Sequence, residues 1–219
     1  MYHLIKKDLL IQKRALKLSA LLIIFFTVTL LHNIGTAGLT IGVLAITYQL
    51  VLGASALEDK DNGDMILISL PIKKTTIVLS KYVSIYIYAA YAILGFYFVY
   101  LIINILNLPL NISFNVTGLM GAITAVTLFC SISFPLMFKY GYLKAKMANL
   151  IIFFLFAFGG TGLVSYLSDN NHLMISQDIM TFFSNKSDIV MYMILLIPLI
   201  CILICSYVIS LSFYNKREF

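Results

Sequence analysis

Acidic side chains are the one group of chemically active residues that this sequence concentrates in a single place. Four of the nine Asp and Glu residues fall within seven positions, at Glu58, Asp59, Asp61 and Asp64. An apolar stretch, 65–70, and then basic residues follow them. The segment is too polar to span a membrane and too apolar to float free in water. We therefore expect it at a membrane interface, with its carboxylates directed towards the aqueous side, where a partner could dock.

Residues that could support catalysis or bind a metal are sparse elsewhere. The sequence has no H-E-x-x-H, G-x-S-x-G or P-loop motif, so nothing predicts a metalloprotease, a serine hydrolase or an ATP site in this chain. Cys201 and Cys205 share a helix face, but we interpret them as small apolar side chains because no His or carboxylate lies near them. Asp169, His172 and Asp178 have a spacing that matches no known metal site. We predict no catalytic residue and no metal site.

The elements that carry these residues are strongly hydrophobic. Of 219 residues, 61% are hydrophobic and 11% are charged, whereas soluble domains are typically about 45–50% apolar and about 25% charged. This composition excludes a soluble domain and a disordered chain. It predicts an integral membrane protein.

Four long runs without any charged residue locate the membrane spans, at 18–57, 82–138, 147–168 and 189–215. A spanning helix needs about 20 apolar residues, so the runs hold two, two, one and one helices. We predict an all-α protein with a single transmembrane domain over 1–219. Its six spans cover about 18–32, 38–57, 78–105, 115–138, 148–167 and 189–213.

The basic residues predict the orientation of these spans. The N-terminus, the C-terminus and the loops 58–77 and 139–147, with the adjoining Lys81, carry 14 of the 15 Lys and Arg residues. The other set of loops carries only Lys186. By the positive-inside rule both termini are cytoplasmic. The positive charge is thereby explained without a nucleic-acid partner.

Residues 1–17 are predicted to form an amphipathic helix in the headgroup plane of the membrane. Tyr2, Ile5, Leu9 and Leu16 recur at helical spacing, with the lysines largely opposite, facing anionic lipid. A plain basic flank that orients the first span is the alternative. A cleaved signal peptide is a further alternative for this end, but the basic stretch before residue 18 is long and no clear cleavage site follows.

The segment 58–81 resembles the loop between the second and third helices of ABC transporter type-2 permeases. The matching positions are Glu58, Ser69, Leu70, Pro71, Lys73, Lys74 and Lys81. The six-span layout with short loops matches along the whole chain. Within that family, the small size is similar to short bacterial permeases that export phenol-soluble modulin peptides or confer bacitracin resistance.

The resemblance implies a permease subunit of an ATP-driven exporter in the bacterial cell membrane. The chain would bind no cofactor, and ATP and Mg would belong to a separate ABC ATPase subunit. A second permease, identical or different, would complete the path. Segment 58–81 would form a cytoplasmic coupling helix seated in a groove of the ATPase. An ordinary interfacial connector is the alternative for this segment.

A second candidate site lies on the third span. Tyr86, Tyr97, Tyr100 and Asn104 share one helix face. Tyrosines in mid-span would suit the path of an amphipathic substrate, and helix packing with membrane-belt anchoring is the alternative.

We expect an apolar or amphipathic substrate, such as a peptide, a peptide antibiotic or a lipid, because no charged residue beyond the boundary Lys81 lies in a span. An ion-coupled or proton-coupled carrier is an alternative that the lack of a buried carboxylate disfavours. A non-catalytic membrane scaffold is another.

Overall fold

The computed structural model describes residues 2–60, 72–107, 114–159 and 188–216, and in these ranges all regular structure is helical. The α-helices are α1 (Tyr2–Ile11), α2 (Lys13–Phe26), α3 (His32–Ile34), α4 (Thr36–Lys60), α6 (Lys74–Ile105), α7 (Val116–Tyr140), α8 (Tyr142–Phe154) and α11 (Asp188–Lys216). Two π-helical segments, Thr27–Leu31 and Leu155–Gly159, continue α2 and α8. The all-α prediction is therefore confirmed for the part of the chain that the structure describes.

Five of the described segments are long and apolar enough to cross a membrane, namely Lys13–Ile34, Thr36–Lys60, Lys74–Ile105, Val116–Tyr140 and Leu196–Lys216. They match the first four predicted spans and the last one, and most begin or end a few residues further out than expected. The predicted fifth span, 148–167, coincides in part with α8 and the π-helical segment after it, while 160–167 lie outside the described residues. The count of six spans and the sidedness of the termini stay predictions.

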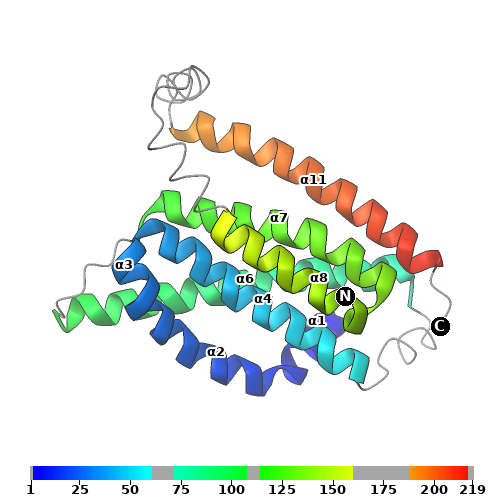
Figure 1. Cartoon of the computed structure of the whole chain (residues 1–219), viewed down its shortest axis with the longest axis horizontal. Coiled ribbons are helices and arrows are strands. Elements are labelled where there is room, and N and C mark those ends of the chain that lie inside the picture. The colour runs from blue at the N-terminus through cyan, green and yellow to red at the C-terminus, as the bar shows by residue number, and fades with distance from the viewer. Residues whose placement is uncertain (1, 61–71, 108–113, 160–187, 217–219) are drawn as a thin grey trace.

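The helices pack side by side along the long axis of the molecule, and α4 lies at the centre of the packing (Figure 1). It contacts α2, α6, α7 and α8. In its most apolar stretch 61% of the residues are buried, against 11% in α11. Apolar character alone does not explain this position, because α11 is the more apolar of the two. Gly38, Gly42 and Gly53 let groups of neighbouring helices approach α4 closely, which suits a helix at the core of the bundle.

The turn between α3 and α4 brings two backbones into direct contact. Gly35 has a φ of 61°, a conformation that favours glycine, and it reverses the chain after α3. One turn later a Cβ atom at Gly38 would lie 2.3 Å from the carbonyl oxygen of Leu30. The absence of a side chain at Gly38 therefore permits the close packing of α4 against the preceding helix.

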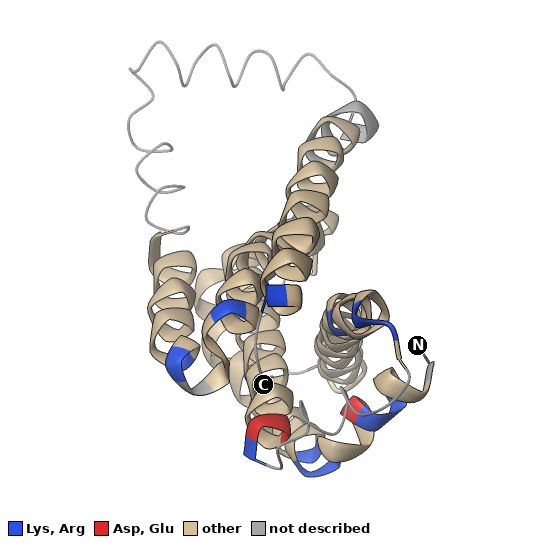
Figure 2. Cartoon of the chain, turned by 90° about the vertical axis from the view of Figure 1, so that its right-hand side faces the viewer, with Lys and Arg blue, Asp and Glu red and all other residues tan. Residues whose placement is uncertain are grey.

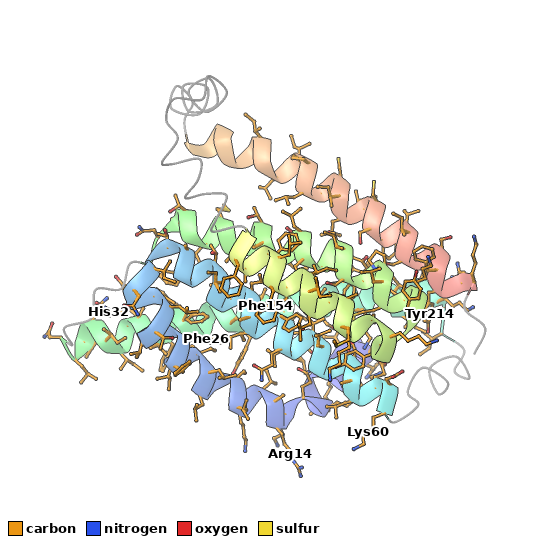
Figure 3. The ribbon with its side chains drawn as sticks, viewed as in Figure 1. Arg14, Phe26, His32, Lys60, Phe154 and Tyr214 are labelled. Atoms are coloured by element: carbon orange, nitrogen blue, oxygen red, sulfur yellow. The ribbon has the colours of Figure 1, made fainter. Side chains whose placement is uncertain are left out.

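The outer helices expose large apolar side chains. Leu21 and Phe25 on α2, and Ile197 and Val208 on α11, are each more than half exposed. Figure 3 shows such side chains extending from the bundle on both of these helices. This surface fits lipid or a second protein chain, and not water.

The three cysteines differ in their environment. Cys130 on α7 is buried. Cys201 and Cys205 are exposed on α11 within the single chain. The reason is that α11 touches the bundle with only a narrow face.

The charged residues gather at one end of the bundle, which we call the charged end (Figure 2). Helix α1, the last turn of α4 and the first turns of α6 meet there. Figure 3 shows Lys60 at this end and His32 at the opposite one. The end of α11 lies at the charged end too, so the two terminal helices end on the same side of the bundle (Figure 1).

Candidate functional site

The acidic segment begins inside a helix. Glu58 and Asp59 were expected in the loop, but α4 continues to Lys60, so this boundary was wrong. The last turn carries two acids, which the dipole at a helix C-terminus disfavours, but Lys60 lies in the same turn and Glu58 is paired with lysines. The turn-forming pair Asn62 and Gly63 comes only after it.

Glu58 is buried and lies between two ammonium groups. Its carboxylate contacts the Nζ atom of Lys81 on α6, and its Oε1 atom lies 2.6 Å from the Nζ atom of Lys7 on α1. Its side chain is only 8% exposed. A carboxylate at this depth needs such partners, since a buried charge without one is costly.

Asp8 on α1 contributes a second buried carboxylate. Its Oδ2 atom lies 3.2 Å from the Nζ atom of Lys81 and 3.5 Å from the hydroxyl oxygen of Ser84, whose hydrogen is donated to the carbonyl oxygen of Ser80. Lys7 lies 3.7 Å from its Oδ1 atom. Asp8, Glu58, Lys7 and Lys81 thus form what we call the four-charge cluster, with two negative and two positive groups.

The four-charge cluster ties three helices together at the charged end. Its residues come from α1, α4 and α6, and the Glu58–Lys81 pair joins the end of α4 to the beginning of α6. These are the two helices that flank the segment 61–73. A displacement of that segment would therefore act on two helices that the Glu58–Lys81 ion pair already holds together.

The contribution of α1 was missed in the sequence. Residues 1–17 were expected to form one helix facing lipid, but α1 ends at Ile11 and packs against α6 and α4. Asp8 is the only acid among the first 57 residues, and it lies one helical turn from Gln12. This isolated acid on an otherwise basic helix was the available signal.

Gln12 fixes the end of α1 to the core. It is fully buried between α1 and α2, and its Nε2 atom donates a hydrogen bond to the carbonyl oxygen of Leu50 on α4. Gly53, one turn further along α4, leaves room for it, since a Cβ there would lie 3.3 Å from Nε2. The N-terminal helix is therefore part of the packed bundle.

Of the other predicted coupling residues, the structure describes Asp59, Lys73 and Lys74. Lys73 is exposed at the residue before α6, and Lys74 lies 6.0 Å from the centroid of the Tyr214 ring on α11. The remaining ones, Asp61, Asp64, Ser69, Leu70 and Pro71, lie outside the described residues.

A cavity of about 50 Å³ lies next to the four-charge cluster. Glu58 and Asp59 line it from α4, Lys81 from α6, Tyr142 from α8 and Tyr214 from α11. Five helices converge on this cavity, since Phe134 lines it from α7. The cavity makes the ends of these helices sensitive to any displacement of α4 or α6.

The tyrosine face of α6 lies on the outside of the chain. Tyr86 is 37% exposed and Tyr97 43% exposed, and Asn104 is exposed as well. The rings of Tyr97 and Tyr100 both pack near Phe114, with centroid distances of 5.3 and 5.8 Å. The structure thus brings Tyr97 and Tyr100 together. A substrate path along this face would need another chain to close it.

A buried hydrogen-bonded group attaches α11 to the rest of the bundle. The hydroxyl oxygen of Tyr82 on α6 lies 2.7 Å from the Oγ atom of Ser206 and 2.9 Å from that of Ser210. Ser206 also donates to the carbonyl oxygen of Ser131 on α7. This group was not predictable from the sequence, because serines and tyrosines in apolar runs give no signal of their pairing.

Long apolar helices, with most of the described charged residues gathered at one end of the bundle, define a multi-pass helical membrane protein. A family model described as "ABC-2 family transporter protein" matches residues 3–215, nearly the whole chain. The chain belongs to this family, and the resemblance seen in the segment 58–81 is confirmed. Membership implies a transport subunit that works with a separate ABC ATPase. Comparison with curated proteins and with solved structures gave no match.

Proposed function

We propose that this chain is the membrane-spanning subunit of an ATP-driven exporter in the bacterial cell membrane, and that its ATPase docks on the segment 58–81. The observation that carries this proposal is the four-charge cluster. It clamps both flanks of the segment, at Glu58 and Lys81, and joins them to α1 through Asp8. Because both flanks of the segment are held by ion pairs, a force that the ATPase exerts on the segment would displace α4 and α6.

The expected mechanism follows from the packing. When ATP closes the two ATPase subunits, the segment 58–81 is displaced, and α4 and α6 move together with α1. Because α4 contacts α2, α6, α7 and α8, its displacement reaches most of the bundle. The charged end would face the cytoplasm, as the positive-inside rule predicts.

The transport path would lie between two permeases, in a homodimer or a heterodimer. The tyrosine face of α6 supports this, because Tyr86 and Tyr97 point out of the single chain. The face offers aromatic area and hydroxyl groups without charge, which suits an apolar or amphipathic substrate. A peptide such as a phenol-soluble modulin, a peptide antibiotic or a lipid has this character.

A proton-coupled carrier is the second candidate, and the buried carboxylates of Asp8 and Glu58 favour it, since intramembrane carboxylates often form proton relays. Both, however, lie at one end of the bundle and each is paired with a lysine. A proton relay has to cross the membrane, and two ion-paired carboxylates at one end of the bundle do not form such a path. The exporter therefore remains the better supported function.

Co-purification with a P-loop ATPase tests the docking surface. Charge reversal at Asp59 together with Asp61 changes the segment but leaves the four-charge cluster intact. We expect the ATPase to be lost from the complex and transport to fall with it. Charge reversal at Lys13, which is exposed on α2, serves as the matched control. Unchanged binding and unchanged transport would show that the ATPase does not dock here.

The energy source is tested in sealed vesicles. An exporter of this kind stops when the ATPase is inactivated and continues in the presence of an ionophore. A carrier shows the opposite pattern, and a scaffold shows no transport by either route.

A further inference from the structure

Tyr88 on α6 has a buried hydroxyl group with no hydrogen-bond partner among the described residues. Its side chain is 2% exposed. Buried polar groups nearly always have a partner in the protein or in ordered water, because an unpaired hydroxyl costs about 1–3 kcal/mol. The buried ring fixes the position of the hydroxyl oxygen, so a hydrogen-bond partner has to lie next to that position.

Tyr88 lines a small cavity. Tyr88, Ser84 and Lys81 line it from α6, Asp8 lines it from α1 and Ser55 from α4. The space open to the centre of a water molecule is about 10 Å³. That is roughly the lower limit for holding a single water molecule.

We infer that this cavity binds one ordered water molecule that joins Tyr88 to Asp8. The Tyr88 hydroxyl donates to the water oxygen, and the water donates to the Asp8 carboxylate. Its second hydrogen can be donated to the hydroxyl oxygen of Ser55 or Ser84. Both oxygens are free to accept, because these hydroxyls donate their own hydrogens to the carbonyl oxygens of Val51 and Ser80. A bound water needs two to four polar partners, and the cavity offers them.

Water fits this cavity better than a metal cation does. The two carboxylates of the four-charge cluster are already balanced by Lys7 and Lys81. A cation would add a third positive charge to a buried site that has only two negative ones.

The small cavity lies next to the cavity of about 50 Å³ at the charged end. The two share Ser55, Lys81 and Phe134 as lining residues. Lys81 therefore lines both spaces, and the inferred water lies at the contact of α1 with α4 and α6.

The change in Tm that a Tyr88 variant of the purified full-length chain shows in detergent tests this inference, because its sign differs between a bonded and an unpaired hydroxyl. Replacing Tyr88 with Phe removes only the hydroxyl. If water joins it to Asp8, Tyr88→Phe lowers the Tm by about 2–4 °C, the shift expected for about 1 kcal/mol in a chain of this size. If the hydroxyl is unpaired, the same variant raises the Tm, and the inference is overturned. Tyr91→Phe is the matched control. Its hydroxyl donates directly to the carbonyl oxygen of Leu16 at 2.9 Å, so this variant shows the fall in Tm that the loss of one hydrogen bond produces.

Hydroxyl-radical labelling detects the water itself. Radicals formed from a bound water modify the side chain next to it, so Tyr88 is expected to be labelled although it is buried. Tyr82 is buried to a similar degree, but its hydroxyl is bonded to Ser206 and Ser210, and it should stay unmodified. An unlabelled Tyr88 would overturn the inference, whatever happens to the Tm.

Discussion

The Nζ atom of Lys81 lies 3.2 Å from the Oδ2 atom of Asp8, although 73 positions separate the two residues in the chain. The contact joins the N-terminal helix to the helix that follows the acidic segment. Lys81 also contacts Glu58, so a single ammonium group serves two carboxylates from two other helices. The packing of α1 against α4 and α6 at the charged end therefore depends on the Lys81 ammonium group.

Replacing Lys81 with Met should destabilise the protein strongly. The change leaves Asp8 and Glu58 buried with only Lys7 to pair with, and breaking a buried ion pair typically costs about 3–5 kcal/mol. Thermal unfolding in detergent measures the loss. Lys73→Met is the matched control, because Lys73 is exposed next to the same helix and should change little. Equal unfolding temperatures for the two variants would contradict a structural role for the cluster.

Replacing Tyr82 with Phe should loosen α11. The variant loses the hydrogen bonds to Ser206 and Ser210, each worth about 0.5–1.5 kcal/mol in a membrane protein. We expect a lower Tm and faster proteolysis near α11. Tyr86→Phe, one turn away on the exposed face of the same helix, should leave both unchanged. If the two variants behave alike, the hydroxyl of Tyr82 does not hold α11.

Replacing Gly38 with Ala should separate the first two membrane helices. The added methyl group would lie 2.3 Å from the carbonyl oxygen of Leu30, and backbone cannot move aside as a side chain can. Overpacking of this kind costs about 1–3 kcal/mol, and denaturant unfolding would detect it. Gly159→Ala is the control, since among the described residues its new methyl group would meet only the side chain of Leu155, at 3.8 Å.

Replacing Tyr97 and Tyr100 with Leu should reduce transport with little effect on stability. The two rings pack near Phe114 and otherwise lie towards the outside of the chain, so Leu retains an apolar surface and loses the aromatic rings and hydroxyls. Substrate export from vesicles is the measurement. Phe98→Leu provides the control, because Phe98 is 65% exposed on a different face of α6. Equal transport by both variants would argue for a lipid-facing role of the tyrosines.

The positions of the helices were predictable from the sequence, because membrane thickness sets their length and charge marks their ends. The runs without charge gave the centre of α4, α6 and α7 correctly. Their exact ends were not predictable, since α4 carries Glu58 and Asp59 within its last turn. Charged residues at a helix end and charged residues in a loop look alike when only the sequence is read.

The partners of the charged residues were not predictable. Segment 58–81 was recognised as a candidate site, yet the role of Asp8 depends on how α1 folds back onto α6. Such a contact joins residues far apart in the chain, and no periodicity reports it. The exposure of Cys201 and Cys205 has the same origin, because an apolar run does not reveal which of its residues face protein and which face lipid.

Gln12 anchors the junction between the two N-terminal helices. Its side chain is bonded to α4, so the place where α1 meets α2 is fixed in the core. At 1.5 Å per residue, the 10 residues of α1 extend about 15 Å from this junction, and the 22 residues of Lys13–Ile34 extend about 33 Å from it. The N-terminal segment is therefore held at an internal point, with α1 packed against α6 on one side of it and α2 packed against α4 on the other.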